Sequence, residues 1–418
     1  MRVMICYPWL DLGGAPNTAI SIAKGIRELG HEVLFFTKPG GIYEERLQAA
    51  DIEMIPASYS KALPHMYHLN AGAYRKMIRA IEDHSIDLIH CFHFNDYYLA
   101  LFAAAARNIP VVYSAVWFLD DAPHPAYRGR VTFVAEEFLD KARGSFGGFP
   151  REMTVIPNRI DLETFHPDVA SEDVAQKYDL PGDGYKIVFM SRVDPTKSKS
   201  LHHAVEAVKE IAAAGTRVYL VIAGDGVSFG DLAAKMENVN SELGYKAVIL
   251  TGAVVETPGL LAWADIVLGI GRCAWEGMAT GKPTLVVGEN GLAGVVEPEK
   301  VDELKYYNFA GRNLEVPVGP GLLSEALNRI INDRELYERL ASFSRQYVLD
   351  NYDYRKGAEK FEKLYQRALD DPRMTRMERF RLLLSVLRRG YFRQLYLVLR
   401  VVMRGYLGRG RPEDKMVH

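Results

Sequence analysis

Cysteine is scarce in this sequence and offers no framework for cross-links or metal binding. The three cysteines, Cys6, Cys91 and Cys273, are far apart and show no metal-ligand spacing. Scattered thiols of this kind do not predict a disulfide scaffold or a cysteine zinc site. We expect them to be buried, as small apolar side chains, in a protein of a reducing compartment.

Long apolar runs and a strong net charge are also missing. No stretch of about 18 uncharged apolar residues occurs, so no membrane-spanning helix is expected. The first apolar run, residues 3–10, is short, contains Pro8 and precedes no cleavage-like site, which predicts a strand and not a targeting signal. The net charge of −2 argues against nucleic-acid binding by the whole surface, and a cytoplasmic protein is expected.

The sequence does contain enough apolar residues for two large cores. Its 48% hydrophobic and 25% charged residues are typical of a globular protein, and 418 residues favour two domains with an appendage. Short apolar segments alternate with helical patterns, and the alternation restarts after a polar segment at about 159–184. This predicts two α/β domains with doubly wound parallel sheets, facing a ligand across a cleft. The expected strands are 3–9, 32–37, 87–92, 110–116, 131–136 and 153–158, then 186–193, 217–226, 247–254, 264–271 and 283–288.

Three segments at expected strand ends carry residues suited to binding an anionic ligand. Gly13 and Gly14 lie between the first strand and its helix, where bare backbone N–H groups favour a phosphate. The alternative for these glycines is a tight turn. In the segment 191–201, Arg192 and Lys197 leave a strand end together and could clamp a diphosphate. A solvated basic loop is the alternative there, and Lys199 could replace Lys197.

The third segment, GIGRCAWEGMATGKP at 269–283, combines four glycines with one carboxylate. Gly269 and Gly271 follow an expected strand, and Glu276 is expected near the start of the next helix. From that position a carboxylate can accept hydrogen bonds from paired hydroxyls, as a ribose presents them. The alternative is a first-turn acid that only complements the helix dipole.

Together these segments resemble the retaining, nucleotide-sugar-dependent glycosyltransferases of family 4. The matching pieces occur in the family's order over about residues 3–300. They are GGAPNTAISIAKGIRELGHEV (13–33), DLIH (87–90), VIPNRIDLETFHP (155–167), SRVDPTKSKSL (191–201), LVIAGDG (220–226), ADIVL (264–268) and EGMATGKP (276–283). The resemblance implies the two-domain GT-B fold and transfer without a metal or other cofactor. It divides the chain into an acceptor-side domain (1–166), a nucleotide-sugar domain (167–350), a helix packing back on the first domain (351–372) and a tail (373–418).

The resemblance also implies roles for the matched residues. Arg192 and Lys197 would hold the diphosphate, and Glu276 would bind the ribose hydroxyls. The remaining donor contacts would come from Gly13, Gly14, Gly271 and Arg272. The hinge residues Asn158 and Asp161 are expected to be structural.

Two positions depart from the family pattern. Leu268 stands where relatives usually have a second Glu, and Val116 stands where many have a His. His90 and His93 follow a nearby strand and could contact acceptor or sugar, or could be ordinary satisfied histidines. These departures affect the expected identity of the transferred sugar more than the expected type of reaction.

The tail from 373 to 418 differs from the rest in composition. Residues 373–411 contain eleven arginines and one acidic residue, Glu378. Met377, Phe380, Leu384, Leu387 and Tyr391 share one helical face. The tail is either a basic helix pair packed on the body or a helix lying on an anionic membrane surface.

The sequence therefore predicts a glycosyltransferase, cytoplasmic or peripheral to the inner face of the cell membrane. It would move a sugar from a nucleotide-sugar to a lipid-linked or surface-glycan acceptor, with retention of configuration. A nucleotide-sugar 2-epimerase of the same fold and a non-catalytic nucleotide-sugar-binding protein are the alternatives.

Overall fold

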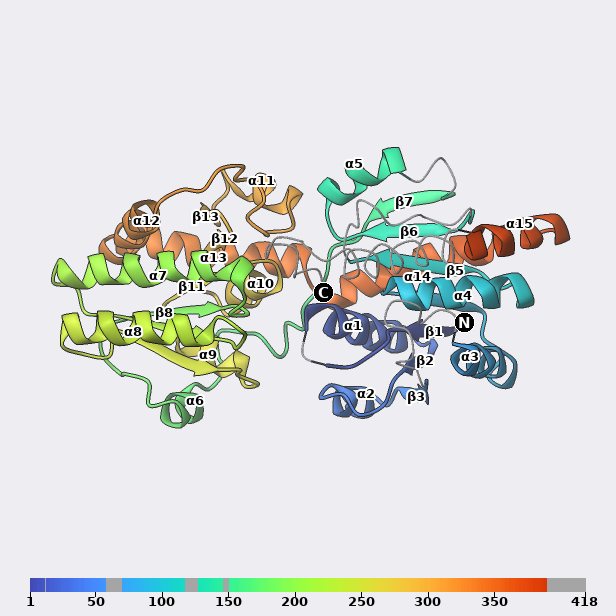
Figure 1. The fold of residues 1–418 in the computed structure, drawn as a ribbon, viewed down its shortest axis with the longest axis horizontal. Coiled ribbons are helices and arrows are strands. Elements are labelled where there is room, and N and C mark those ends of the chain that lie inside the picture. The colour runs from blue at the N-terminus through green and yellow to red at the C-terminus, as the bar shows by residue number, and fades with distance from the viewer. Residues whose placement is uncertain (12, 58–69, 117–126, 146–149, 389–418) are drawn as a thin grey trace, which may run out of the picture. The chain divides into compact units, whose positions relative to one another are not determined.

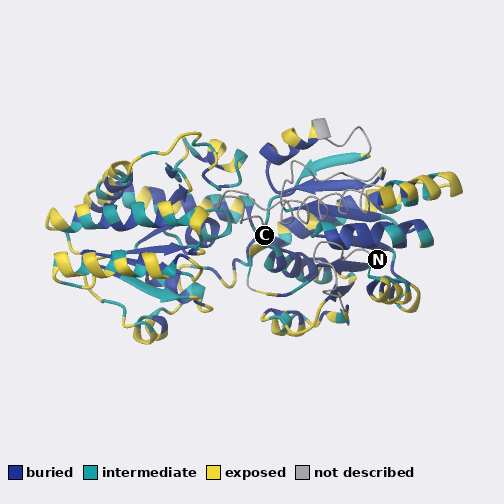
Figure 2. Cartoon of the chain, in the orientation of Figure 1, coloured by how far each residue is buried: buried dark blue, intermediate teal, exposed yellow. Residues whose placement is uncertain are grey.

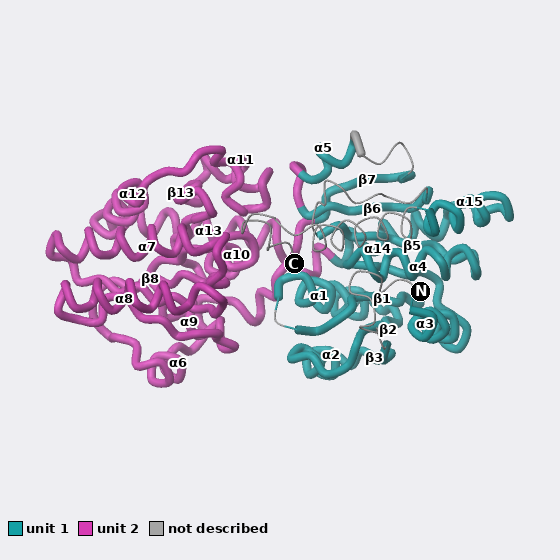
Figure 3. The backbone as a smooth tube through the Cα atoms, viewed as in Figure 1, with its two compact units in different colours: residues 1–134, 138–156, 358–418 teal, residues 135–137, 157–357 magenta. Residues whose placement is uncertain are grey.

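The structure is a computed structural model that describes residues 1–11, 13–57, 70–116, 127–145 and 150–388. The chain divides into two compact units, shown in different colours in Figure 3. Unit 1 comprises residues 1–134, 138–156 and 358–418, and unit 2 comprises residues 135–137 and 157–357. The chain therefore leaves unit 1, builds unit 2 and returns to unit 1 within its last helices.

Unit 1 is built on a seven-stranded sheet in the order β3-β2-β1-β4-β5-β6-β7. Every pair of neighbouring strands is parallel. The strands are β1 (Arg2–Cys6), β2 (Glu32–Thr37), β3 (Glu53–Pro56), β4 (Leu88–Cys91), β5 (Val111–Ala115), β6 (Arg130–Phe133) and β7 (Glu152–Val155). Its central strands are dark blue in Figure 2, because a parallel sheet is covered on both faces.

The helices of unit 1 cover this sheet, as Figure 1 shows. They are α1 (Gly14–Glu28), α2 (Glu44–Ala49), α3 (Ala71–Asp83), α4 (Phe94–Arg107), most of α5 (Glu136–Ser145), most of α14 (Tyr354–Leu369) and α15 (Arg376–Val386). Phe361, Leu364 and Tyr365 of α14 are buried in one core with residues of β1, β2 and β4. The end of the chain thus completes the core that its beginning starts.

The last described helix, α15, packs against α4. Its Leu382 and Val386 are buried, and Arg379 donates to the carbonyl oxygens of Ala105 and Ala106 at the end of α4. Cationic side chains at a helix C-terminus satisfy its last carbonyls and complement its dipole. Tyr391 and the rest of the tail, 389–418, lie outside the described residues.

Unit 2 is built on a six-stranded sheet in the order β10-β9-β8-β11-β12-β13. Its strands are β8 (Tyr185–Met190), β9 (Val218–Ala223), β10 (Val248–Gly252), β11 (Ile266–Gly269), β12 (Thr284–Gly288) and β13 (Gly291–Val295). Its helices are α6 (Glu172–Lys177), α7 (Pro195–Ala213), α8 (Phe229–Leu243), α9 (Thr257–Trp263), α10 (Arg272–Ala279), α11 (Val301–Tyr306), α12 (Pro320–Asn332) and α13 (Arg334–Asn351).

One edge of this sheet differs from the fully parallel arrangement predicted from sequence. The edge strand β13 runs antiparallel to β12. Only Glu289 and Asn290 connect the two strands, and so short a connection can make a hairpin but not a parallel crossover. Gly291 begins β13 with φ +105°, a conformation that favours glycine.

The predicted two-domain, doubly wound α/β architecture is confirmed. Among the described residues, none of the helices is both long enough and apolar enough to cross a bilayer.

Candidate active site

The loop after β8 brings the predicted cations to the start of α7. Asp194 caps this helix: its carboxylate accepts hydrogen bonds from the Lys197 backbone N–H at 3.1 Å and the Thr196 hydroxyl at 2.6 Å. Pro195 occupies the first helical position, where its missing N–H costs nothing. The helix therefore begins at Pro195, and Lys197 lies in its first turn.

Two glycines after β9 fix the position of this loop. A Cβ atom at Gly224 would lie 1.8 Å from the carbonyl oxygen of Ser191, and one at Gly226 would lie 2.3 Å from that of Val193. The Val193 N–H donates to the Asp225 carbonyl at 3.0 Å, which ties the two loops together. Only glycine permits so close an approach, and the contact holds the backbone on either side of Arg192.

Arg192 and Lys197 have different environments. The Arg192 side chain is 76% exposed and lies 3.5 Å from the Asp194 carboxylate. Lys197 is half-buried, and burial lowers the pKa of its amine, whereas the carboxylates of Asp194 and Glu289 act to raise it. Arg192 and Arg312 also act to lower the Lys197 pKa, so these three cations lie within electrostatic reach of one another. Lys199, the alternative to Lys197, is exposed.

The segment 269–283 forms the end of β11, the helix α10 and the turn after it. Gly271 precedes the helix with φ +51° and ψ −121°, which favours glycine. A Cβ atom at Gly277 would lie 2.5 Å from the Val267 side chain, so this glycine allows α10 to pack closely on β11. Gly281 follows the helix at φ +73°. Three of the four glycines are thus explained by backbone conformation and packing.

Glu276 lies in the second turn of α10, and not at its start as predicted, because the helix begins at Arg272. Arg272 Nε donates to Glu276 Oε1 at 2.6 Å, and the two side chains are only 13% and 8% exposed. A guanidinium nitrogen of Arg272 also donates to the Arg159 carbonyl oxygen at 3.0 Å. A cation at the first position of a helix is opposed by the dipole, and the Glu276 carboxylate offsets this by pairing with the guanidinium.

These residues gather at one edge of the sheet of unit 2. Arg192 and Lys197 follow β8, and Gly271, Arg272 and Glu276 follow β11, its neighbour. Both strands are parallel, so their carboxyl ends meet at one edge, where open α/β sheets bind ligands. Among the described residues no side chain caps the first turn of α10, and only its Cys273 N–H is already bonded, to the Ile270 carbonyl at 3.2 Å, so the N–H groups of Arg272 and Ala274 are available to an anion.

The other predicted residues belong to unit 1. Gly13 precedes α1 and Gly14 begins it; no side chain of the described residues caps this end, and none of their atoms lies within 4 Å of a Cβ atom placed at Gly14. His93 caps α4, with Nδ1 accepting from the Asn95 N–H at 3.2 Å, and its ring centroid lies 5.1 Å from that of Trp9. Burial lowers the His93 pKa to about 4. These residues lie at the carboxyl edge of the sheet of unit 1.

His90 is fully buried and has both ring nitrogens occupied. Nδ1 lies 2.6 Å from the Tyr365 hydroxyl and Nε2 lies 2.7 Å from that of Ser114, which in turn contacts Thr132 at 2.7 Å. Burial lowers the His90 pKa to about 3. This environment matches the alternative of a satisfied core histidine.

The two residues that depart from the family pattern both pack in apolar surroundings. Leu268 is fully buried in a core with residues of β8 and β12, and Val116 packs against the core of unit 1. Sequence reasoning missed Arg159 and Arg312. Arg159 is 1% exposed although it lies between the hinge residues Asn158 and Asp161, and no sequence signal reveals this. Arg312 donates to Glu137 at 2.8 Å from a loop without periodicity.

Comparison with known families decides the class. A model of Glycosyltransferase Family 4 matches residues 12–164, and a model of Glycosyl transferases group 1 matches residues 170–347. The chain is a glycosyltransferase of the GT-B fold.

Relatives of this glycosyltransferase cover most or half of its length. The alpha-monoglucosyldiacylglycerol synthase of Streptococcus pneumoniae is 23% identical over 85% of this chain and 88% of its own. An Escherichia coli UDP-Gal:alpha-D-GlcNAc-diphosphoundecaprenol alpha-1,3-galactosyltransferase is 27% identical over 52% of this chain and 54% of its own. The Anabaena protein HepE, solved in complex with UDP-glucose, has a TM-score of 0.64 and 19% identity over 88% of this chain and 100% of its own.

Proposed function

We propose that this glycosyltransferase moves a sugar from a nucleotide-sugar donor to a lipid-linked or surface-glycan acceptor, with retention of anomeric configuration. The observation that carries the proposal is the grouping of Arg192, Lys197 and the Arg272–Glu276 pair at the carboxyl edge of one parallel sheet. Two relatives support the acceptor class, since their names specify a monoglucosyldiacylglycerol product and a GlcNAc-diphosphoundecaprenol acceptor. The HepE complex supports a nucleotide-sugar donor.

In this proposal the diphosphate of the donor lies between Arg192 and Lys197 and the uncapped end of α10. Charge-assisted hydrogen bonds of this kind contribute roughly 1.5–3 kcal/mol each. In unit 1, the start of α1 at Gly13 and Gly14 is by itself also suited to bind an anionic group, because its backbone N–H groups are not covered by a capping side chain of the described residues. Because negative charge on the diphosphate increases as it leaves, the cations stabilise the transition state more than the bound donor.

Glu276 accepts hydrogen bonds from the ribose hydroxyls of the donor. Arg272 holds this buried carboxylate in one orientation, because it bonds both Glu276 and the Arg159 carbonyl. A carboxylate fixed in this way loses little freedom when the ribose binds.

Retention follows if the acceptor oxygen attacks the anomeric carbon on the same face from which the diphosphate departs. The bond from the anomeric carbon to the phosphate oxygen breaks, and the bond to the acceptor oxygen forms on the same face. The leaving phosphate accepts the acceptor's proton, so the protein mainly positions the groups and stabilises charge.

We further propose that α15 holds the enzyme on an anionic membrane surface, where lipid-linked acceptors lie. Met377, Phe380, Leu384 and Leu387 are 58%, 56%, 50% and 43% exposed. The sequence spacing of three, four and three residues places them on one helical face, beside Arg376, Arg381 and Arg388. An exposed apolar stripe flanked by arginines is typical of a helix that lies in a membrane interface.

Transfer is tested by incubating the full chain with a panel of UDP- and GDP-sugars and diacylglycerol or polyprenyl-diphosphate-sugar acceptors. We expect a glycosylated lipid whose anomeric proton coupling matches that of the donor. An inverted anomeric centre would contradict retention, and epimerisation of the donor without any acceptor would favour the isomerase.

A further inference from the structure

Unit 1 contains a second site, at the opposite edge of its sheet from Gly14 and His93. A cavity of about 590 Å³ is lined by residues just before or at the starts of β5, β6 and β7 and by the connection between α14 and α15. In a parallel sheet the strands begin at one edge and end at the other, so this is the amino-terminal edge. The cavity is therefore separate from the residues expected to take part in transfer.

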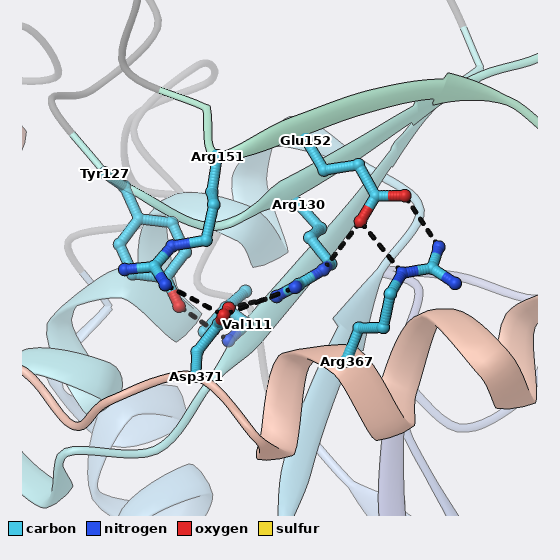
Figure 4. Close-up of polar contacts among 7 residues, drawn as sticks. All are labelled: Val111, Tyr127, Arg130, Arg151, Glu152, Arg367 and Asp371. Carbon is cyan, nitrogen blue, oxygen red and sulfur yellow. Dashed lines mark hydrogen bonds and ion pairs between the residues drawn. The ribbon is translucent and has the colours of Figure 1, made fainter.

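An ionic network centred on the buried Arg130 forms part of the wall of this cavity (Figure 4). Arg130, which is 7% exposed, donates to Glu152 at 2.9 Å and pairs with Asp371. Arg151 also pairs with Asp371 at 2.9 Å, and Arg367 pairs with Glu152 at 2.6 Å. Three guanidinium groups thus share two carboxylates, and neither carboxylate remains to neutralise further cations.

Three more arginines line the cavity and are exposed: Arg128, Arg373 and Arg381. In the described part of the chain, none of the three has a carboxylate within ion-pair distance, and Arg373 donates only to the Asn108 carbonyl at 3.0 Å. The cavity's other acid, Glu378, accepts from the Thr375 N–H and hydroxyl at 2.8 and 2.9 Å as part of the cap of α15. The cavity therefore has an excess of positive charge.

The cavity borders the exposed apolar stripe of α15. Arg381 lines the cavity and lies between Phe380 and Leu384 in the sequence of the helix. At 100° per residue, its side chain projects beside the face that those two residues share. A molecule with a phosphate in the cavity and an acyl chain on the stripe would satisfy both surfaces.

We infer that this cavity binds the phosphate of an anionic lipid headgroup while α15 rests on the membrane. The inference rests on the proposed membrane role of α15. Guanidinium groups match phosphate oxygens with paired hydrogen bonds. A choline or ethanolamine cation would add positive charge to a cavity that already has an excess, so an anionic headgroup is favoured over a zwitterionic one.

The first test uses a readout that needs no membrane. The melting temperature of the full chain is measured with short-chain phosphatidylglycerol below its micelle concentration, with the matching phosphatidylcholine, and with inorganic phosphate. We expect the melting temperature to rise with phosphatidylglycerol but not with the other two additives, because a ligand that binds the folded state stabilises it. This rise should be lost in the variant Arg128→Gln/Arg381→Gln. No rise, or an equal rise with inorganic phosphate, would overturn a lipid site.

The second test measures co-sedimentation with vesicles of phosphatidylcholine alone or with added phosphatidylglycerol. The matched control is Arg75→Gln/Arg79→Gln on α3, two exposed arginines of the same unit with the same change of charge. We expect the cavity variant to lose about 25-fold of the affinity that phosphatidylglycerol adds, at about fivefold for each of its two arginines, and the control to lose little. Equal losses in both variants would overturn the site.

The two tests separate failure of the cavity from failure of the membrane proposal. If wild type binds no vesicles but its melting temperature rises with short-chain phosphatidylglycerol, the lipid site stands and the membrane role of α15 falls. If vesicle binding needs the α15 stripe but is unchanged in Arg128→Gln/Arg381→Gln, the membrane role stands and the cavity site falls.

Discussion

The apolar stripe of α15 supports a prediction whose size can be worked out. Burial of a large apolar side chain is worth about 1.5–3 kcal/mol, and the four stripe residues expose about half of their surface. Moving the stripe from water into a membrane interface should therefore contribute about 3–6 kcal/mol. At about 1.4 kcal/mol per tenfold, its loss should weaken membrane partitioning by about 10²–10⁴-fold.

The perturbation is replacement of the stripe by glutamine, which keeps helix propensity and net charge. The variant carries Met377→Gln, Phe380→Gln, Leu384→Gln and Leu387→Gln. Because Leu382, Val386 and the Arg379 contacts remain, we expect α15 to stay packed on α4. Retention of helical circular dichroism checks this point.

The assay is co-sedimentation with anionic vesicles over a range of lipid concentrations. The control replaces exposed apolar residues of unit 2, which are 85%, 68%, 70% and 50% exposed. It carries Val227→Gln, Val255→Gln, Val316→Gln and Leu322→Gln, and should bind like wild type. If the α15 variant sediments with vesicles as well as wild type does, the stripe is not a membrane surface and the reasoning is wrong.

Three further predictions concern the two units. In a coupled transfer assay, Lys197→Ala should lower kcat/KM by about 10–100-fold, because a charge-assisted contact is lost, while Lys199→Ala should change kcat/KM little. A large loss in Lys199→Ala and a small one in Lys197→Ala would instead assign the diphosphate contact to Lys199. Arg272→Leu should raise the donor KM and lower the free energy of unfolding by about 1.5–3 kcal/mol, as measured by urea titration, and an unchanged KM would count against its role in holding Glu276. The pKa of His90 is lower in the folded protein, about 3, than in the unfolded chain, about 6.5, so its contribution to stability is complete above about pH 6.5 and falls as the pH drops toward 3. Urea titrations should show about 1.4 kcal/mol of this loss between about pH 7.5 and 5.5, and His90→Gln should make the pH dependence shallower by that amount; an equal slope in both proteins would disprove the assignment.

The sequence predicted helix starts less well than strands, for a physical reason. Apolar runs mark the strands of the two sheets except the edge strands β3 and β13, because buried strands need apolar side chains. The first turns of α1, α7 and α10, which begin at Gly14, Pro195 and Arg272, show no apolar periodicity. Their first turns contain glycine, proline or charged residues, which face solvent or a ligand and so carry no apolar pattern.

Sequence alone determined the class of fold, the ordered motifs of the family and the kinds of residue at the candidate site. These depend on local periodicity and on residues close together in the chain. Only the tertiary structure shows that Arg272 bonds Glu276 and the Arg159 carbonyl and that the Tyr365 hydroxyl bonds His90. It also shows that the α14–α15 connection lines one cavity with the starts of β5, β6 and β7. Those contacts join residues as many as 275 positions apart, and which side chains become buried together depends on strand order and helix packing, which no local pattern encodes.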